Sequence, residues 1–202
     1  MAPAISSRRL AEMTTTMLSI QIEQALFELH NAVVGKRRAI DRLVGATIVG
    51  EPVGLAGPSG VGKSHLVDAV RRVFGLERVE LDATAIAASA DLDPGCLYVV
   101  ERDDLDTAQV DQLGQTLCRS AAASVIVTTT ATDPVLMPSR LREELVSYIE
   151  IPYPSAAEEM ALAIDGTRPH SIDRILRADD LAAMRSTARR MPIADRVVAY
   201  AV

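Results

Sequence analysis

The residues with the clearest chemical meaning in this chain form one glycine-rich segment. Its sequence is Gly57-Pro58-Ser59-Gly60-Val61-Gly62-Lys63-Ser64, which matches the pattern G-x-x-x-x-G-K-S/T at every fixed position. Glycines let backbone N–H groups turn inward around phosphate oxygens, and the N-terminus of a following helix adds partial positive charge. Lys63 can then reach the β- and γ-phosphates of a nucleoside triphosphate, and Ser64 can bind Mg²⁺.

The residues on either side of this segment predict the elements that must hold it. Residues 53–56 form a short apolar run that is typical of a buried strand. Apolar residues then recur at helical spacing over residues 66–74. A strand, a glycine-rich turn and a helix are the context in which this pattern binds phosphate. We therefore expect ATP and Mg²⁺ as cofactors, bound by residues 57–64 and the adjoining His65.

The composition of the whole chain narrows the class of protein. Its 202 residues fit one domain, or one domain with a small appendage. Aromatic residues make up only 3 %, so the core must consist mainly of Val, Leu, Ile and Ala, which suits layers of helices and strands. The net charge of −6 argues against non-specific DNA binding. Two cysteines form no disulfide or metal framework, and no apolar run is long enough to span a membrane, which favours a reducing cytoplasm.

Apolar patterns along the chain predict an α/β fold with a mostly parallel, five-stranded sheet and helices on both faces. The expected strands are residues 53–56, 78–81, 96–100, 124–129 and 148–151. The expected helices cover residues 18–33, 40–48, 66–74, 107–119 and 141–145, and residues 83–95 are expected to be loop or weak helix. Ser155 and Glu158 form a capping-box signature for a further helix. Residues 171–202 predict two helices hinged at Met191-Pro192.

This order of elements resembles the AAA+ superfamily of ring-forming P-loop ATPases, and more narrowly its MoxR and magnesium-chelatase branch. The resemblance covers residues 30–202. Residues 33–36 match the family segment that lies against the adenine, which adds Val34 and Gly35 to the expected nucleotide site. Residues 149–159 and 179–200 resemble the family's exit from its fifth strand and its entry into a helical lid.

The resemblance also implies how the chain is divided. We expect a flexible N-terminus over residues 1–13, an AAA+ nucleotide-binding domain over residues 14–165, and a short, truncated helical lid over residues 166–202. The spacing leaves no room for the hairpin insertions of MoxR and chelatase proteins. The family's further lid helices and its second sensor arginine do not occur before Val202.

The second acidic motif of the family is altered in this chain. The family has four apolar residues followed by Asp-Glu, whereas residues 97–100 are followed by Glu101 and Arg102. Asp104 supports this alignment, since it matches a family Asp or Asn. Glu101 then stands where the family's Asp helps to hold Mg²⁺, and Arg102 stands where its Glu polarises the attacking water. A guanidinium cannot act as a base, so we expect impaired or absent hydrolysis unless a local shift lets Asp103 or Asp104 substitute.

Two further family positions fall on identifiable residues. The polar sensor at the end of the fourth strand falls near Thr129 or Thr130, and a threonine can still donate a hydrogen bond to phosphate or water. The arginine that reaches a neighbouring subunit's nucleotide falls near residues 143–145. Arg140 and Arg142 are close to it and could act in this way, or they could be solvated arginines of a helix surface.

Three functions remain open from the sequence. The first is an oligomeric, chaperone-like remodelling ATPase that works as a ring or partial ring with an adaptor, such as a von Willebrand A-type partner. The second is a hydrolysis-deficient nucleotide-binding assembly module. The third is a DNA-associated AAA+ protein, which we do not favour because basic groups such as residues 36–38, 71–72 and 189–190 lack interleaved aromatic residues.

Overall fold

The centre of the protein is a five-stranded parallel sheet in the order β2-β3-β4-β1-β5. The computed structural model describes residues 7–88, 92–119, 123–133, 137–165 and 171–191. The strands are β1 (Val53–Ala56), β2 (Glu77–Glu80), β3 (Cys96–Glu101), β4 (Ser124–Thr129) and β5 (Ser147–Glu150). Each neighbouring pair is parallel. The predicted α/β class and five-stranded parallel sheet are therefore confirmed.

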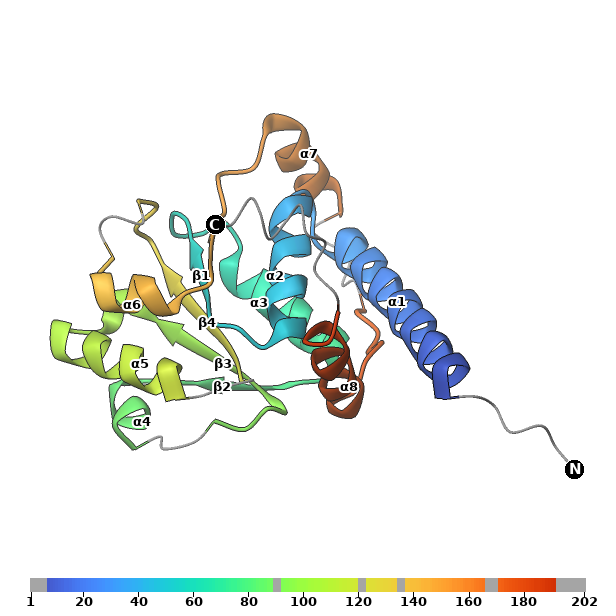
Figure 1. Cartoon of the computed structure of the whole chain (residues 1–202). Helices are drawn as coiled ribbons and strands as arrows, with labels where there is room; N and C mark the ends of the chain where they lie inside the picture. The colour runs from blue at the N-terminus through green and yellow to red at the C-terminus, as the bar shows by residue number, and fades with distance from the viewer. Residues whose placement is uncertain (1–6, 89–91, 120–122, 134–136, 166–170, 192–202) are drawn as a thin grey trace, which may run out of the picture.

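Helices cover both faces of this sheet (Figure 1). One face carries α1 (Ser7–Ala32), α2 (Arg37–Val49), α3 (Lys63–Phe74) and α8 (Ala178–Ala188). The other face carries α4 (Ala83–Ala88), α5 (Thr107–Arg119) and α6 (Ser139–Glu144). A short 3₁₀ turn, η1 (Arg102–Asp104), follows β3, and α7 (Ala156–Asp165) follows β5.

Alternate residues of the central strands point into two separate hydrophobic cores. Val99 and Ile126 pack in the core shared by α1, α2, α3 and α8, whereas Val100 and Val127 pack in the core below α4, α5 and α6. Side chains alternate between the faces of a strand, so a strand that is covered on both sides must be apolar throughout. This requirement explains why β3 and β4 are continuous apolar runs.

The structure differs from the sequence prediction at the N-terminus, and it decides between loop and helix for part of residues 83–95. The N-terminus was expected to be loosely ordered up to residue 13, but α1 begins at Ser7. The reason is local, because residues 7–13 contain Arg, Leu, Ala, Glu and Met, which favour helix, and no Gly or Pro. Within residues 83–95, α4 forms because Asp82 caps it, accepting hydrogen bonds from the backbone N–H groups of Thr84 and Ala85.

The described part of the C-terminal region packs onto the domain that carries the glycine-rich segment. The backbone N–H groups of Ile175 and Leu176 both donate to the Val73 carbonyl oxygen at 3.0 Å. Leu181 is fully buried, and the buried Arg185 guanidinium donates to Ser124 Oγ at 2.7 Å. The expected division at residue 166 stays a prediction, and the helix expected beyond Met191-Pro192 lies outside the described residues. Within the described part of the chain, no helix has the length and apolar character that a bilayer crossing requires.

Candidate functional site

The glycine-rich segment connects the end of β1 to the start of α3. Gly60 and Gly62 have φ angles of +82° and +92°, in the left-handed region that glycine adopts without strain. A Cβ atom added to Gly60 would meet nothing within 4 Å, so backbone conformation and not space calls for glycine there. The helix α3 begins at Lys63, which leaves its first backbone N–H groups directed toward the segment. The result is a turn of backbone donors at a positive helix end, as an anion site requires.

Neighbouring strands hold the start of this loop in place. The Gly57 N–H donates to the Thr129 carbonyl of β4 at 3.1 Å, and the N–H of Ile151, which follows β5, donates to the Ala56 carbonyl at 2.7 Å. A Cβ atom on Gly57 would collide with the Ile151 carbonyl oxygen. The loop is therefore fixed between the carboxyl ends of the two strands that flank β1.

A hollow of about 380 Å³ lies at this edge of the sheet. It brings together most of the residues expected to bind nucleotide with two expected catalytic residues. Its lining residues are Ser59, Gly60, Gly62, Lys63, Ser64, His65, Glu101 and Thr130. Residues far apart in the sequence thus meet because parallel strands end at one edge of the sheet.

Lys63 folds back over the loop. Its Nζ donates to the carbonyl oxygens of Gly57 at 2.5 Å and Pro58 at 3.1 Å. These neutral oxygens hold an ammonium group beside the inward-turned backbone. A phosphate oxygen is a stronger partner for that ammonium, because both members of the bond are then charged.

Glu101 is held at the same hollow by the neighbouring strand. Glu101 lies opposite Thr128 in the sheet register, and its Oε2 accepts a hydrogen bond from Thr128 Oγ1 at 2.7 Å. Its carboxylate and the Ser64 hydroxyl are oxygen ligands of the kind that Mg²⁺ prefers. In proteins Mg²⁺ usually keeps several waters and is held by one or two carboxylates together with phosphate oxygens. Among the described residues, no cluster of three or more His, Cys, Asp or Glu side chains could hold a metal ion.

Asp103, which the sequence analysis names only as a possible substitute base, has contacts at this site that the sequence did not predict. The η1 turn carries its carboxylate to the end of β4, where it accepts hydrogen bonds from Thr129 Oγ1 at 2.8 Å and from both the N–H and the hydroxyl of Thr130 at 2.7 Å. Burial raises the pKa of Asp103, but the bonds from Thr130 and Thr129 and the charge of Arg102 outweigh it and hold the pKa below its ordinary value. Both Asp103 and Asp104 are exposed, but Asp103 is the one that hydrogen-bonds to the predicted sensor threonines.

The two arginines expected to act on a neighbouring subunit lie away from this hollow. Both Arg140 and Arg142 are exposed on α6, and neither is among the described residues that line the hollow. The Arg140 side chain lies over α5, with Cγ 3.2 Å from the position that a Cβ on Gly114 would occupy. Their expected role in trans stays a prediction.

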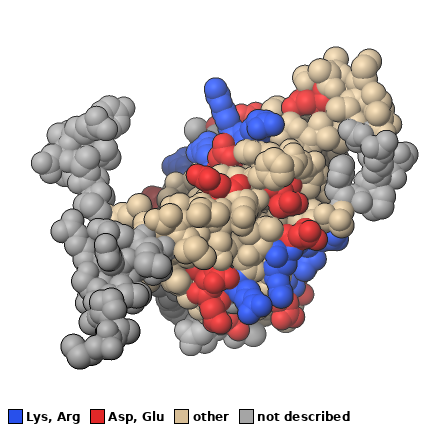
Figure 2. Space-filling view, turned by 90° about the vertical axis from the view of Figure 1, so that its right-hand side faces the viewer, with Lys and Arg blue, Asp and Glu red and all other residues tan. Residues whose placement is uncertain are grey.

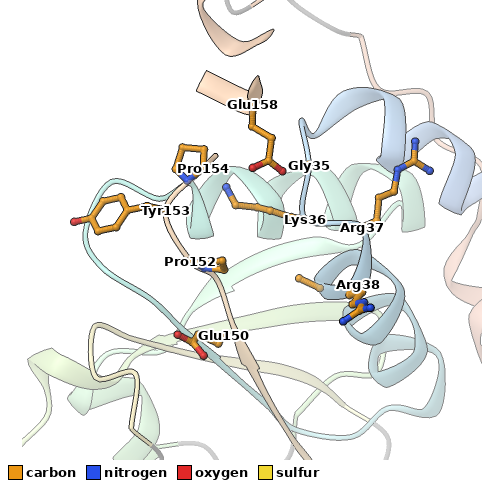
Figure 3. A pocket seen from close by; sticks show the side chains of 10 residues that line it. Gly35, Lys36, Arg37, Arg38, Glu150, Pro152, Tyr153, Pro154 and Glu158 are labelled. Carbon is orange, nitrogen blue, oxygen red and sulfur yellow. The ribbon is translucent and has the colours of Figure 1, made fainter. Parts of the chain in front are cut away.

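A second hollow, of about 540 Å³, adjoins the loop (Figure 3). Gly35 lines it, directly after the half-buried Val34, and the expected role of both residues in a nucleotide site stays a prediction. The rings of Pro152, Tyr153 and Pro154 contribute apolar surface, which suits a planar base. Lys36 lines this second hollow, and its Nζ donates to the Val61 carbonyl of the loop at 2.7 Å.

Comparison with known proteins identifies the fold. No protein-family model matches the chain, and no curated protein matches it. Among solved structures, a putative ATPase from Cytophaga hutchinsonii ATCC 33406 matches with a TM-score of 0.75 and 15% sequence identity, over 95% of this chain and 70% of that one. Taken with the strand order, this match decides the fold. The chain has the AAA+ type of P-loop fold. An inhibitor-bound JCV helicase matches less well, with a TM-score of 0.49 and 13% identity, over 90% of this chain and 62% of that one.

The contacts of Asp103 predict a specific acid sensitivity. A carboxylate whose pKa is lowered on folding stabilises the fold above its unfolded pKa, and this contribution disappears as the pH falls through the folded pKa. We expect Asp103→Asn to destabilise the protein at neutral pH, and the difference from wild type to shrink as the pH falls below the ordinary Asp pKa of 3.8. Urea unfolding at a series of pH values measures this.

Asp104→Asn is the matched control, because it removes the adjacent carboxylate and leaves the bonds to Thr129 and Thr130 intact. A stability difference for Asp103→Asn that stays constant across the whole pH series would contradict the role given to these hydrogen bonds.

Proposed function

We propose that this protein binds ATP together with Mg²⁺ and acts as a MoxR-like AAA+ protein with weak hydrolysis. The observation that carries the proposal is the hollow in which Lys63, Ser64 and Glu101 meet at the N-terminus of α3. It offers an ammonium, backbone donors, a hydroxyl and a carboxylate, which are the groups that hold a nucleoside triphosphate and its metal. Bound Mg²⁺ would neutralise charge on the phosphates, with Ser64 and Glu101 as its protein ligands.

Weak hydrolysis follows from the residues after β3. Arg102 is always protonated and cannot take a proton from water. Asp103 is the nearest alternative base, but Thr129 and Thr130 already engage both of its carboxylate oxygens. Hydrogen bonds of this kind lower the basicity of a carboxylate and fix its direction. A hydrolysis-deficient assembly module is therefore the second candidate function, and Arg102 is the observation that favours it.

The proposed role as an oligomeric remodelling factor rests on α6. Arg140 and Arg142 are exposed there, and an arginine can bind a phosphate of another copy through two parallel hydrogen bonds. A ring or partial ring with an adaptor, such as a von Willebrand A-type protein, is the arrangement that would use them. Binding to nucleic acid is not favoured, because Lys and Arg lie among Asp and Glu on the face that Figure 2 presents. In addition, Asp68 pairs with both Arg71 and Arg72, at 2.9 and 2.8 Å.

Replacing Lys63 tests nucleotide binding. We expect Lys63→Ala to weaken Mg-ATP binding by about tenfold or more, because a charged hydrogen bond to phosphate is lost in a partly desolvated site. Isothermal titration calorimetry measures the affinity. Arg72→Ala is the control, since it removes a cation from the same helix outside the hollow. The proposal fails if wild-type protein at high micromolar concentration shows no binding of Mg-ATP.

Restoring a carboxylate at position 102 tests the account of hydrolysis. We expect Arg102→Glu, alone or with Glu101→Asp, to raise steady-state ATP turnover above wild type, because a glutamate there can polarise water. Arg102→Gln is the matched control, which removes the charge without adding a base. A Lys63→Ala background shows how much turnover comes from contaminants.

A fast wild-type rate that survives Arg102→Ala but collapses in Asp103→Ala or Asp104→Ala would contradict this assignment. It would show that one of these aspartates, and not the residue at position 102, handles the attacking water. The same assay separates the two candidate functions, since an assembly module binds ATP with little or no turnover.

A further inference from the structure

Lys36 connects the larger hollow to the glycine-rich loop through a hydrogen bond. It lines the larger hollow, and its Nζ donates to the Val61 carbonyl at 2.7 Å. The same atom is 3.9 Å from the position that a Cβ on Gly62 would occupy, and Gly62 lines the smaller hollow. An ammonium group therefore stands beside the loop on the side that faces the larger hollow.

The backbone at Lys36 is unusual for a lysine. Among the described residues, Lys36 is the one non-glycine residue with positive φ, at 59°, and Gly35 before it has a φ of 69°. Gly35 has no Cβ atom and adopts this conformation without strain. Lysine has no intrinsic preference for the left-handed region, so its surroundings must hold it there. Residues held in sparsely populated conformations are concentrated at functional sites.

The Lys36 side chain is partly buried and lies near the Glu158 carboxylate. Burial lowers the pKa of Lys36, and the Glu158 carboxylate partly offsets this effect. Glu158 is itself held by the N–H and hydroxyl of Ser155, at 2.7 and 2.9 Å. Figure 3 shows the Lys36 side chain passing near the Glu158 carboxylate, whereas Arg37 of the same hollow points away. Lys36 is therefore placed by its neighbours, and Arg37 offers a nearby cation without that placement.

We propose that Lys36 is a second phosphate-facing cation of this site, which contacts the phosphate group nearest to the nucleoside. This inference rests on the nucleotide binding proposed above. In this arrangement the terminal phosphates of the nucleotide lie under Lys63 and its base lies in the larger hollow. The phosphate nearest to the nucleoside must then lie beside Gly62, next to Lys36. The ammonium then exchanges the neutral Val61 carbonyl for a charged oxygen, which is the stronger partner. Lys63 contacts the β- and γ-phosphates, and Lys36 contacts the α-phosphate.

A series of ligands tests this assignment. We would measure the affinities of adenosine, AMP, ADP and ATP by NMR titration for wild type, Lys36→Asn, Lys36→Arg, Arg72→Ala and Lys63→Ala. Asparagine is chosen at position 36 because it tolerates the left-handed backbone better than other non-glycine residues. We expect Lys36→Asn to weaken AMP, ADP and ATP by a similar factor of about ten, and to leave adenosine unchanged. Lys36→Arg should restore part of the loss, and Arg72→Ala, which removes a cation that lines neither hollow, should change none of the affinities.

Lys63→Ala should behave differently, with a loss for ADP and ATP but not for AMP. The assignment of Lys36 is overturned if Lys36→Asn weakens adenosine as much as AMP, weakens only ATP, or weakens nothing. If Lys36 merely supported the fold, Lys36→Asn would lower the free energy of unfolding measured in urea, and we expect no such loss. If wild-type protein binds none of the four ligands, the proposal of nucleotide binding itself is wrong. If wild type binds them and Lys36→Asn binds them equally well, only the assignment of Lys36 is wrong.

Discussion

The structure depends on the position of one short strand, β1, between β4 and β5. Hydrogen bonds from Gly57 to Thr129 and from Ile151 to Ala56 fix the end of this strand to both neighbours. Because all strands are parallel, their carboxyl ends lie at one edge, and the loop after β1 opens between them. The contacts of Lys63 follow from that placement, and the pairing of β3 with β4 brings Glu101 and Asp103 to the same edge. A loop with the same sequence on an unsupported turn would not hold its donors in a fixed arrangement.

Two acidic residues of the site, Glu101 and Asp103, make different contacts. Glu101 lines the hollow and accepts a hydrogen bond from Thr128, whereas Asp103 accepts hydrogen bonds from the threonines at the end of β4. Arg102 lies between them. A carboxylate that already accepts several hydrogen bonds is a weak base, and our proposal of nucleotide binding with weak hydrolysis rests on this point. Binding and turnover are therefore separate questions for this protein.

Much of this arrangement could be predicted from the sequence, and the rest depends on local backbone geometry. The strands and the loop were predictable because buried parallel strands are continuous apolar runs and the loop pattern is specific. The contact between Asp103 and the threonines was not, since it depends on the 3₁₀ turn that decides which of two adjacent aspartates faces β4. The direction of Lys36 was not predictable either, because a left-handed lysine gives no signal in the sequence. The burial of Leu181 against the domain core likewise depends on packing between distant segments.

The central claim is that backbone N–H groups of this loop surround the phosphates of ATP. Amide NMR spectra of the wild-type protein, recorded during titration with Mg-ATP, test it most directly. The account predicts that the largest shifts belong to the amides of residues 60–65, and that smaller shifts occur at Lys36 and Thr130. Shifts that gather elsewhere in the chain, or spectra that Mg-ATP leaves unchanged, would contradict it.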